Sequence, residues 1–197
     1  FYPINFKIFK PRNKIGLRKK HNLPLQKKII LFSSSDIKDE RKGIKYFIKI
    51  ANHFKNDASF YFVTLGNSKN INLSIKNKNY SHIEFLSHNK SAEIYSLSDL
   101  YVCTSIIDNL PLTILESMSS GLPVITFDNG GSKEAVMDNG YIVKNRDYLA
   151  IIKILSNLKK KQVQTLSKKS RIFALNNFHP SKIANNYIKI FQNINKN

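Results

Sequence analysis

The sequence has few of the features that mark disulfide-bonded, secreted or membrane-spanning proteins. One residue of 197 is cysteine, Cys103. A single cysteine excludes an internal disulfide and best fits a reducing compartment. No apolar run approaches the roughly 18 residues that a membrane span needs, and we find no charged-then-apolar signal segment. Because residue 1 is phenylalanine rather than methionine, we expect this chain to be part of a longer protein.

The sequence also lacks the common fingerprints of nucleotide, hydrolase and metal sites. It has no G-x-G-x-x-G, G-x-x-x-x-G-K-[ST] or G-x-S-x-G motif, so an NAD-binding, P-loop or α/β-hydrolase protein lacks support. There is no C-x-x-C or D-x-D pair, and the histidines show no metal-ligand spacing. Among the histidines, His82 and His88 have the best claim to a functional role because they flank a predicted strand and its loop. We expect no metal or other cofactor.

Acidic residues are scarce, with 13 Asp and Glu against 32 Lys and Arg and a formal net charge of +19. Such a surface attracts polyanions, which include nucleic acid, anionic lipid and phosphorylated substrates. The lysines are spread through the chain, so a compositional bias that only solvates the surface explains the charge equally well. The densest basic run falls on a predicted helix, and we expect it to form a solvated or lipid-facing side of that helix. The run consists of Lys159, Lys160, Lys161, Lys168, Lys169 and Arg171.

Apolar periodicity predicts strands that alternate with helices. The first strand, KKIILFSSS, is an apolar run that ends in small polar residues, as in a buried parallel strand. A charged loop follows it at 36–42, Gly66 and Asn67 should stop the second strand, and 68–80 predicts only a weak helix or a loop. Strands are predicted at 27–35, 59–65, 82–86, 99–104, 123–127 and 140–143. Helices are predicted at 15–22, 44–51, 92–97, 112–119 and 130–137, with three more over 147–194.

This alternation implies an α/β fold with a Rossmann-like, doubly wound parallel sheet, helices on both faces and additional C-terminal helices. Residues 1–14 contain Pro3 and Pro11 and predict an extended connector laid against the domain. Residues 15–197 are predicted to form one nucleotide-sugar-binding domain, for the reasons that follow.

Ligands of open α/β sheets bind outside the carboxyl ends of the strands. Four segments should meet there, at 33–43, 86–88, 104–113 and 129–132, and the last two lead into helix N-termini that favour an anion. Lys42 adds positive charge. Asp108 and Glu116 would repel phosphate but suit sugar or ribose hydroxyls. Together these groups describe a nucleotide sugar, although acids near a helix start are also common without any ligand.

The run DNLPLTILESMSSGLPVITFDNGGSKEAV resembles the signature of retaining GT-B glycosyltransferases of the group-1 (GT4-like) family. That signature is an acid, seven residues, Glu, a small-residue helix, G-x-P-V and a G-G loop. Asp108 and Glu116 match the two acids, and Gly130-Gly131 matches the loop. Arg41-Lys42-Gly43 is similar to the family's diphosphate-contacting loop. The flanking segments PINFKIFKPRNK, HIEFLSHNKSAEIYSLSDLYVCTS and NNFHPSKIANNYIKIF extend the resemblance over nearly the whole chain.

The resemblance implies the C-terminal, donor-binding half of a metal-independent glycosyltransferase of the hexosyltransferase type. Its catalytic residues would be Glu116 on the donor ribose, Asp108 on the transferred sugar and Lys42 on the diphosphate leaving group. Asp108 is one methylene shorter than the usual Glu, and Ser33-Ser34-Ser35 stands where many members have a G-R loop. The implied donor-binding residues are Arg41, Lys42, Ser87, Asp108, Asn109, Leu110, Pro111, Leu112, Thr113 and Glu116.

The expected substrate is a UDP- or GDP-sugar, used in cell-surface polysaccharide or glycolipid synthesis. The family's N-terminal acceptor domain is absent from this chain, so we expect the chain to bind donor without transferring sugar alone. We expect a cytoplasmic protein, with a peripheral contact to an anionic membrane surface supported by its charge. Two alternatives are a non-catalytic scaffold of the same fold and a basic nucleic-acid-binding module. The second conflicts with aromatics at 60–62 that lie in a predicted strand.

Overall fold

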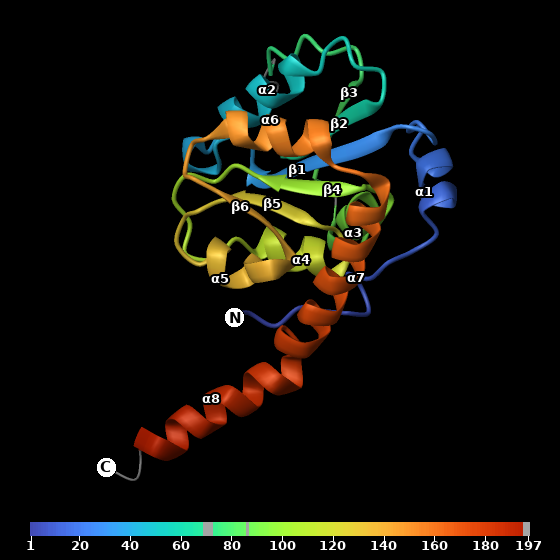
Figure 1. Cartoon of the computed structure of the whole chain (residues 1–197). Helices are drawn as coiled ribbons and strands as arrows, with labels where there is room; N and C mark the ends of the chain where they lie inside the picture. Colours follow the sequence, from blue (N-terminus) through green and yellow to red (C-terminus); the bar gives the residue numbers. More distant parts are fainter. Residues whose placement is uncertain (69–72, 86, 195–197) are drawn as a thin grey trace.

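The computed structural model describes residues 1–68, 73–85 and 87–194. Its centre is a six-stranded sheet in the order β3-β2-β1-β4-β5-β6, with every neighbouring pair parallel (Figure 1). The order reverses between β1 and β4, which makes the sheet doubly wound and confirms the predicted fold class. The strands are β1 (Lys28–Asp36), β2 (Phe60–Asn67), β3 (Tyr80–Ile83), β4 (Leu100–Cys103), β5 (Val124–Phe127) and β6 (Gly140–Val143).

Helices cover both faces of the sheet. α2 and α6 pack together on one face, while α3, α4, α5 and α7 lie on the other (Figure 1). The α-helices are α1 (Lys14–Lys20), α2 (Ile44–His53), α3 (His88–Leu97), α4 (Leu112–Ser119), α5 (Ser132–Val136), α6 (Tyr148–Asn157), α7 (Lys160–Asn177) and α8 (Pro180–Ile194). Two short 3₁₀ helices are η1 (Glu40–Lys42) and η2 (Met137–Asn139). None of the helices within the described ranges is long and apolar enough to cross a bilayer.

The apolar first strand explains the two cores. Ile29 and Leu31 of β1 enter the core beneath α3, α4 and α7, whereas Ile30 and Phe32 enter the core beneath α2 and α6. Successive strand side chains point to opposite faces, so a continuous apolar run serves both layers. β1 and β4, from which the two central loops of the site leave, are both packed on two faces.

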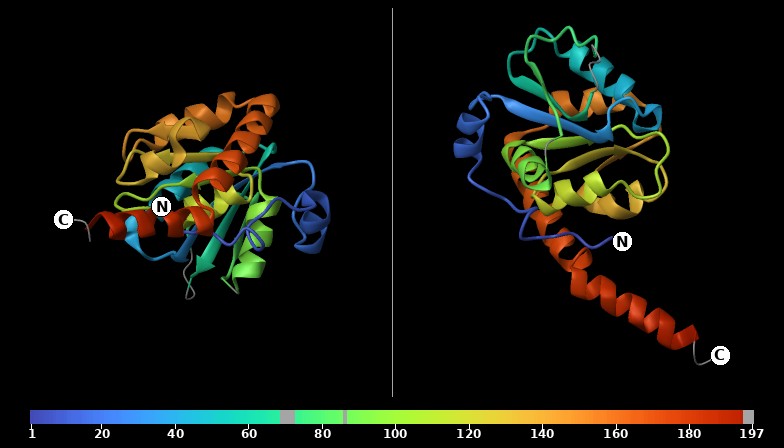
Figure 2. Two further views of the ribbon diagram at one scale, coloured as in Figure 1. Left: turned by 90° about the horizontal axis from the view of Figure 1, so that it is seen from below. Right: turned by 180° about the vertical axis from the view of Figure 1, so that it is seen from behind.

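The N-terminal segment packs onto the domain rather than hanging free. Ile4 and Phe9 are buried in the core with α3, α4 and α7, and the Ile4 amide donates to the Phe178 carbonyl at 3.0 Å. α8 differs, because it projects away from the body of the domain (Figure 2). Of its side chains only Ile183 is buried, and its exposed apolar residues are Tyr187, Ile188, Ile190, Phe191 and Ile194.

Several predicted boundaries were wrong, because strand pairing or a helix cap decided them. β2 continues through Gly66 and Asn67, since Asn67 pairs with Asp36 beyond a register shift in β1. Gly66 has φ +151°, and a Cβ there would lie 1.9 Å from the Ser34 carbonyl oxygen, so only glycine fits the strand. β3 ends at Ile83, where its pairing with β2 stops. α3 begins four residues before the predicted start, at His88.

Other predictions agree or fall outside the described residues. α4 has the predicted bounds, and its first residue, Leu112, is exposed. The charged loop at 36–42 contains η1. Residues 69–72 of the 68–80 segment and residue 86 of the third predicted strand lie outside the described residues, and 73–79 have no regular secondary structure.

Candidate functional site

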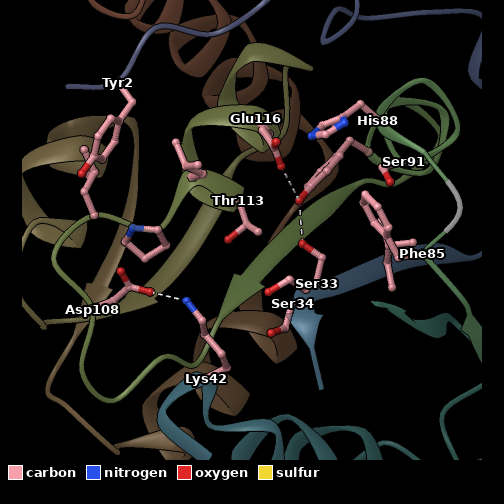
Figure 3. Close-up of a pocket in the computed structure, with 16 residues that line it drawn as sticks. Tyr2, Ser33, Ser34, Lys42, Phe85, His88, Ser91, Asp108, Thr113 and Glu116 are labelled. Carbon is pink, nitrogen blue, oxygen red and sulfur yellow. Dashed lines mark hydrogen bonds and ion pairs between the residues drawn. The ribbon is translucent and has the colours of Figure 1, made fainter. Parts of the chain in front are cut away.

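A cavity of about 420 Å³ opens at the carboxyl edge of the sheet (Figure 3). It lies where the sheet order reverses, because the loops that leave β1 and β4 run in opposite directions and part there. The cavity is lined by Tyr2, Ser33, Ser34, Ser35, Lys42, Leu65, Phe85, His88, Ser91, Tyr95, Asp108, Leu110, Pro111, Leu112, Thr113 and Glu116.

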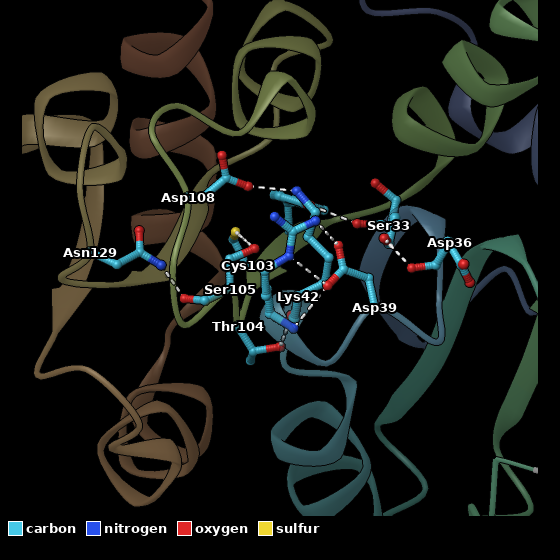
Figure 4. A network of polar contacts seen from close by, with 12 residues as sticks. Ser33, Asp36, Asp39, Lys42, Cys103, Thr104, Ser105, Asp108 and Asn129 are labelled. Carbon is cyan, nitrogen blue, oxygen red and sulfur yellow. Dashed lines mark hydrogen bonds and ion pairs between the residues drawn. The ribbon is translucent and has the colours of Figure 1, made fainter.

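One side of the cavity carries an ion pair between η1 and the loop after β4. Lys42 Nζ lies 2.5 Å from Asp108 Oδ2, and the Lys42 side chain is 28% exposed (Figure 4). The two residues are 66 positions apart, and they meet because η1 follows β1 while Asp108 follows the neighbouring β4. The Thr104 hydroxyl donates to the Gly43 carbonyl at 3.0 Å and ties the two loops together. The cation predicted for phosphate is therefore paired with the acid predicted for sugar.

The N-terminus of α4 forms the floor beside Asp108. Pro111 occupies the N-cap position, where no side chain caps the helix. The amides of the first turn, at Leu112 and Thr113, have no intrahelical acceptor and carry partial positive charge. Because Leu110, Pro111, Leu112 and Thr113 all line the cavity, this helix end can receive an anion.

The opposite wall is built around the Glu116 carboxyl. Glu116 Oε2 accepts a hydrogen bond from the Tyr95 hydroxyl at 3.1 Å, and that hydroxyl lies 2.6 Å from Ser33 Oγ (Figure 3). Burial raises the pKa of Glu116 to about 7, and the hydrogen bond from Tyr95 limits the rise. Burial likewise raises the pKa of Tyr95 well above its ordinary value, so Tyr95 remains a neutral donor.

The Gly-Gly loop supports the site from behind instead of lining it. The Gly131 amide donates to the Asn109 carbonyl at 2.5 Å, and the Asn129 side-chain amide donates to the Ser105 carbonyl (Figure 4). A Cβ on Gly130, which has φ +38°, would lie 2.1 Å from the Asp108 carbonyl oxygen. Residues 129–132 do not line the cavity; they fix the backbone that carries Asp108.

Replacing Gly130 by alanine is expected to lower the free energy of unfolding by about 1–3 kcal/mol, because alanine is strained at this φ and meets backbone. Urea denaturation measures the change. Gly16→Ala is the matched control, since its Cβ would approach only the Asn13 side chain, at 3.2 Å, in a helix that favours alanine. Equal stability of Gly130→Ala and the unaltered chain would show that this close approach is not required.

The structure brings together most of the residues predicted to bind the donor. Lys42, Asp108 and Glu116 line one cavity with the stretch from Leu110 to Thr113. The remaining predicted residues do not line it. Arg41 turns outward onto Asp39, with nitrogen–oxygen distances of 3.0 and 2.8 Å. Ser87 caps α3 by accepting a hydrogen bond from the Lys90 amide. Asn109 and Arg41 line a second hollow beside Asp108.

Sequence reasoning missed the residues that surround Glu116. Tyr95 lies on the buried face of α3 and contacts Glu116 from 21 positions away. A clue exists, because a tyrosine buried in a helix needs a partner for its hydroxyl. Ser33 was predicted as the first residue of the 33–43 segment and as part of a departure from the family motif, but not as a partner of Tyr95. Tyr2 belongs to the segment described as a connector. The described residues contain no group of three or more His, Cys, Asp or Glu that could hold a metal ion.

The structure also shows the surroundings of the basic run on α7 and of the aromatic residues of β2. Arg171 of α7 is half-buried, and its guanidinium donates to the carbonyls of Phe9 and Ser119, so it ties the N-terminal segment to α4. The prediction that Arg171 belongs to a solvated side was therefore wrong, whereas the lysines of that run are exposed. Phe60 and Phe62 are buried in the core, as their position in a strand predicted.

The domain has a Rossmann-like fold with a cavity at its switch point. This cavity combines groups that attract anions with carboxylates that can accept hydrogen bonds from hydroxyl groups. The family model for group 1 glycosyl transferases matches residues 13–174. The chain therefore belongs to the group 1 glycosyl transferases, as the sequence motif predicted.

Individual relatives agree with this assignment. Spore coat protein SA of Bacillus subtilis is 31% identical over 121 residues, which is 56% of this chain and 32% of that protein. The C-terminal domain of a group 1 glycosyl transferase (LpcC) from Francisella tularensis superposes with a TM-score of 0.78 at 21% identity, over 90% of this chain and 99% of that domain. Anabaena Alr3699/HepE, solved in complex with UDP-glucose, gives a TM-score of 0.81 at 14% identity, over 97% of this chain and 56% of that chain.

The shares of each relative that are covered show which part of the GT-B fold this chain forms. It has the fold of the C-terminal domain of the Francisella protein, and it spans about a third of the curated Bacillus relative. The predicted family and the predicted half of the GT-B fold are both confirmed.

Proposed function

We propose that this chain is the nucleotide-sugar donor-binding domain of a retaining, metal-independent glycosyltransferase. One observation carries the proposal: a single cavity at the switch point combines Lys42 and the uncapped N-terminus of α4 with the carboxylates of Asp108 and Glu116. Cationic and amide groups suit the diphosphate, and carboxylates suit hydroxyl groups. A nucleotide sugar is the ligand class that contains both.

Each group then has a distinct role. Glu116 accepts hydrogen bonds from the ribose hydroxyls, and Asp108 accepts them from the transferred sugar. Main-chain amides at the start of α4 hold phosphate oxygens. The UDP-glucose complex of Anabaena HepE, which shares this fold, supports the ligand class. We propose a UDP- or GDP-sugar as the donor.

Lys42 supplies the charge that the reaction requires. As the bond between sugar and diphosphate breaks, negative charge grows on the leaving phosphate, and a positioned cation stabilises that charge. Donor binding moves Lys42 from Asp108 toward the diphosphate, which frees Asp108 for sugar hydroxyls. This reciprocal exchange makes a divalent metal unnecessary in the proposed mechanism.

The rest of the enzyme is needed for transfer. We propose that an N-terminal domain supplies the acceptor site, and that the exposed apolar face of α8 packs against it, since Tyr187, Ile190 and Phe191 have few neighbours in this chain. The charge of +19 favours a peripheral contact of a cytoplasmic enzyme with anionic lipid. The products proposed are cell-surface polysaccharides or glycolipids.

Titration calorimetry of the chain with UDP, GDP and their sugars tests the proposal. We expect dissociation constants in the micromolar to millimolar range and about tenfold weaker binding by Glu116→Ala, since its ribose hydrogen bonds are lost. The matched control is Glu134→Ala, an exposed carboxylate on α5. No heat from any nucleotide would indicate the non-catalytic scaffold, while oligonucleotide binding with a steep salt dependence would indicate the nucleic-acid alternative.

A further inference from the structure

Glu116 is held by a chain of hydroxyl groups from two other elements. Tyr95 on α3 donates to Glu116 Oε2 at 3.1 Å, so the hydrogen bond of 2.6 Å between Ser33 and Tyr95 has Ser33 Oγ as its donor. Tyr101 on β4 adds a bond from its hydroxyl to the Ser33 carbonyl at 3.3 Å. Tyr95 is 1% exposed and packs edge-on against Phe9 at 6.0 Å between ring centroids, so its hydroxyl has little freedom to move.

The second oxygen of Glu116 remains available. Within the described residues no hydrogen bond to Oε1 is found, while Oε2 is taken by Tyr95. Glu116 also lines the cavity, and the hydrogen bond to its carboxylate comes from Tyr95 of α3. A carboxylate anchored through one oxygen presents the other in a fixed direction, which lowers the entropy lost on binding a hydroxyl pair.

We propose that Tyr95 is a positioning residue for donor binding: its hydroxyl, oriented by Ser33, fixes Glu116 so that the free carboxylate oxygen meets the ribose hydroxyls. This inference rests on the proposed function, because it assigns the ribose to Glu116. It adds a hydrogen-bonded support from α3 and β1 that stabilises the ionised carboxylate. Ligand affinity then depends on pH, since only the ionised form accepts hydrogen bonds from both ribose hydroxyls.

The surroundings of Glu116 leave Tyr95 as its only polar partner within the described residues. Lys42 is engaged by Asp108, Lys133 lies 3.8 Å from Asp128, and Arg171 donates to two carbonyls. Titratable and charged groups stand on most of the elements that face or pack against α4. They are His88, Lys90, Glu93 and Tyr95 of α3, Tyr101 and Cys103 of β4, Lys133 and Glu134 of α5, Arg171 and the lysines of α7, and Tyr2, Lys42 and Asp108 across the cavity.

Tyr95→Phe tests the inference, because phenylalanine keeps the ring packing and removes only the hydroxyl. The pKa of Glu116, about 7 in the chain, should rise when this donor is lost. Binding of UDP-glucose and GDP-mannose, whose sugar-capped phosphates do not titrate near neutral pH, should weaken about five- to tenfold at pH 7. The loss should shrink toward pH 9, where Glu116 is ionised in both proteins. The two proteins differ only in the Tyr95 hydroxyl, so the difference between their pH profiles isolates Glu116.

The control is Tyr80→Phe on β3, which removes a hydroxyl that lies 2.7 Å from Thr64 Oγ1 of β2. This variant should bind both sugar nucleotides with unchanged affinity. Carboxyl ¹³C NMR of Glu116 without ligand measures the pKa directly in the chain and in Tyr95→Phe. An unchanged pKa, or an equal loss of affinity at every pH, would overturn the positioning role. If the pKa rises but the unaltered chain binds neither sugar nucleotide, the contact is real and the proposed function is what fails.

Discussion

Replacing Lys42 by alanine is expected to weaken UDP or GDP binding by about a hundredfold. Charge-assisted hydrogen bonds to the diphosphate contribute about 1.5–3 kcal/mol. Alanine also leaves Asp108, now 2.5 Å from Lys42 Nζ, as an unpaired carboxylate beside two phosphate groups, and this repulsion adds to the loss. Calorimetry should compare UDP with uridine, whose affinity should not change because it carries no phosphate.

Two variants separate the phosphate role of Lys42 from a general effect of charge. Lys133→Ala removes an exposed lysine of α5 that lies 3.8 Å from Asp128 and outside the cavity, so its UDP affinity should equal that of the unaltered chain. Asp108→Asn releases Lys42 and removes a negative charge, so UDP should bind roughly threefold more tightly while the preference for sugar-bearing nucleotides falls. A Lys42→Ala protein with unchanged UDP affinity would refute the assignment of Lys42 to the diphosphate.

Replacing Asp99 by alanine is expected to lower the free energy of unfolding by about 3 kcal/mol or more, because it leaves a buried guanidinium without its counter-ion. Arg18 is 4% exposed, and its Nη2 lies 2.5 Å from Asp99 Oδ2. The same carboxylate accepts the Ile29 amide of β1 at 2.8 Å and Lys14 Nζ at 2.7 Å. Urea denaturation at pH 7 measures the loss.

Lys14→Ala is the control for this network, since the Lys14 side chain is 40% exposed and should cost less than about 1 kcal/mol. Acid provides a second check. Burial alone would raise the pKa of Asp99, but Lys14, Arg18 and the Ile29 amide lower it below its ordinary value. The stabilisation by a depressed carboxyl is complete above its unfolded pKa, about 3.9, and is lost as the pH falls through its folded pKa. A stability difference from Asp99→Ala that persists unchanged in acid would contradict this account.

Local periodicity was sufficient for the elements that fill the two cores. The bounds of α4 follow from buried Leu115 and Met118 at helical spacing and from Gly121 as a stop. The apolar run of β1 predicts a strand covered on both faces. Boundaries failed where a neighbouring strand or a cap decides them: pairing with β1 extends β2 through Asn67, and the Ser87 cap starts α3 early.

The candidate site divides in the same way. Asp108 lies in a loop and Glu116 in the helix that follows it, so their motif can be recognised in one continuous stretch of sequence. Arg41 was grouped with Lys42 because both belong to the stretch that resembles the family's diphosphate-contacting loop, yet adjacent residues of a 3₁₀ turn point in different directions. Arg41 consequently bonds Asp39 outside the cavity. Tyr95 carried no motif, because its importance comes only from the carboxylate it touches.

Local sequence patterns predicted the family, the alternation of strands and helices and the acids of the Asp108–Glu116 motif, because these depend on residues that are close along the chain. The folded chain alone shows that Lys42 meets Asp108 and that Tyr95 meets both Ser33 and Glu116. Those contacts require β1 to lie against β4, with Ile30 opposite Leu100. The physical reason is that strand order and register are set by burial of the whole sheet between its helices, and no local pattern encodes that arrangement.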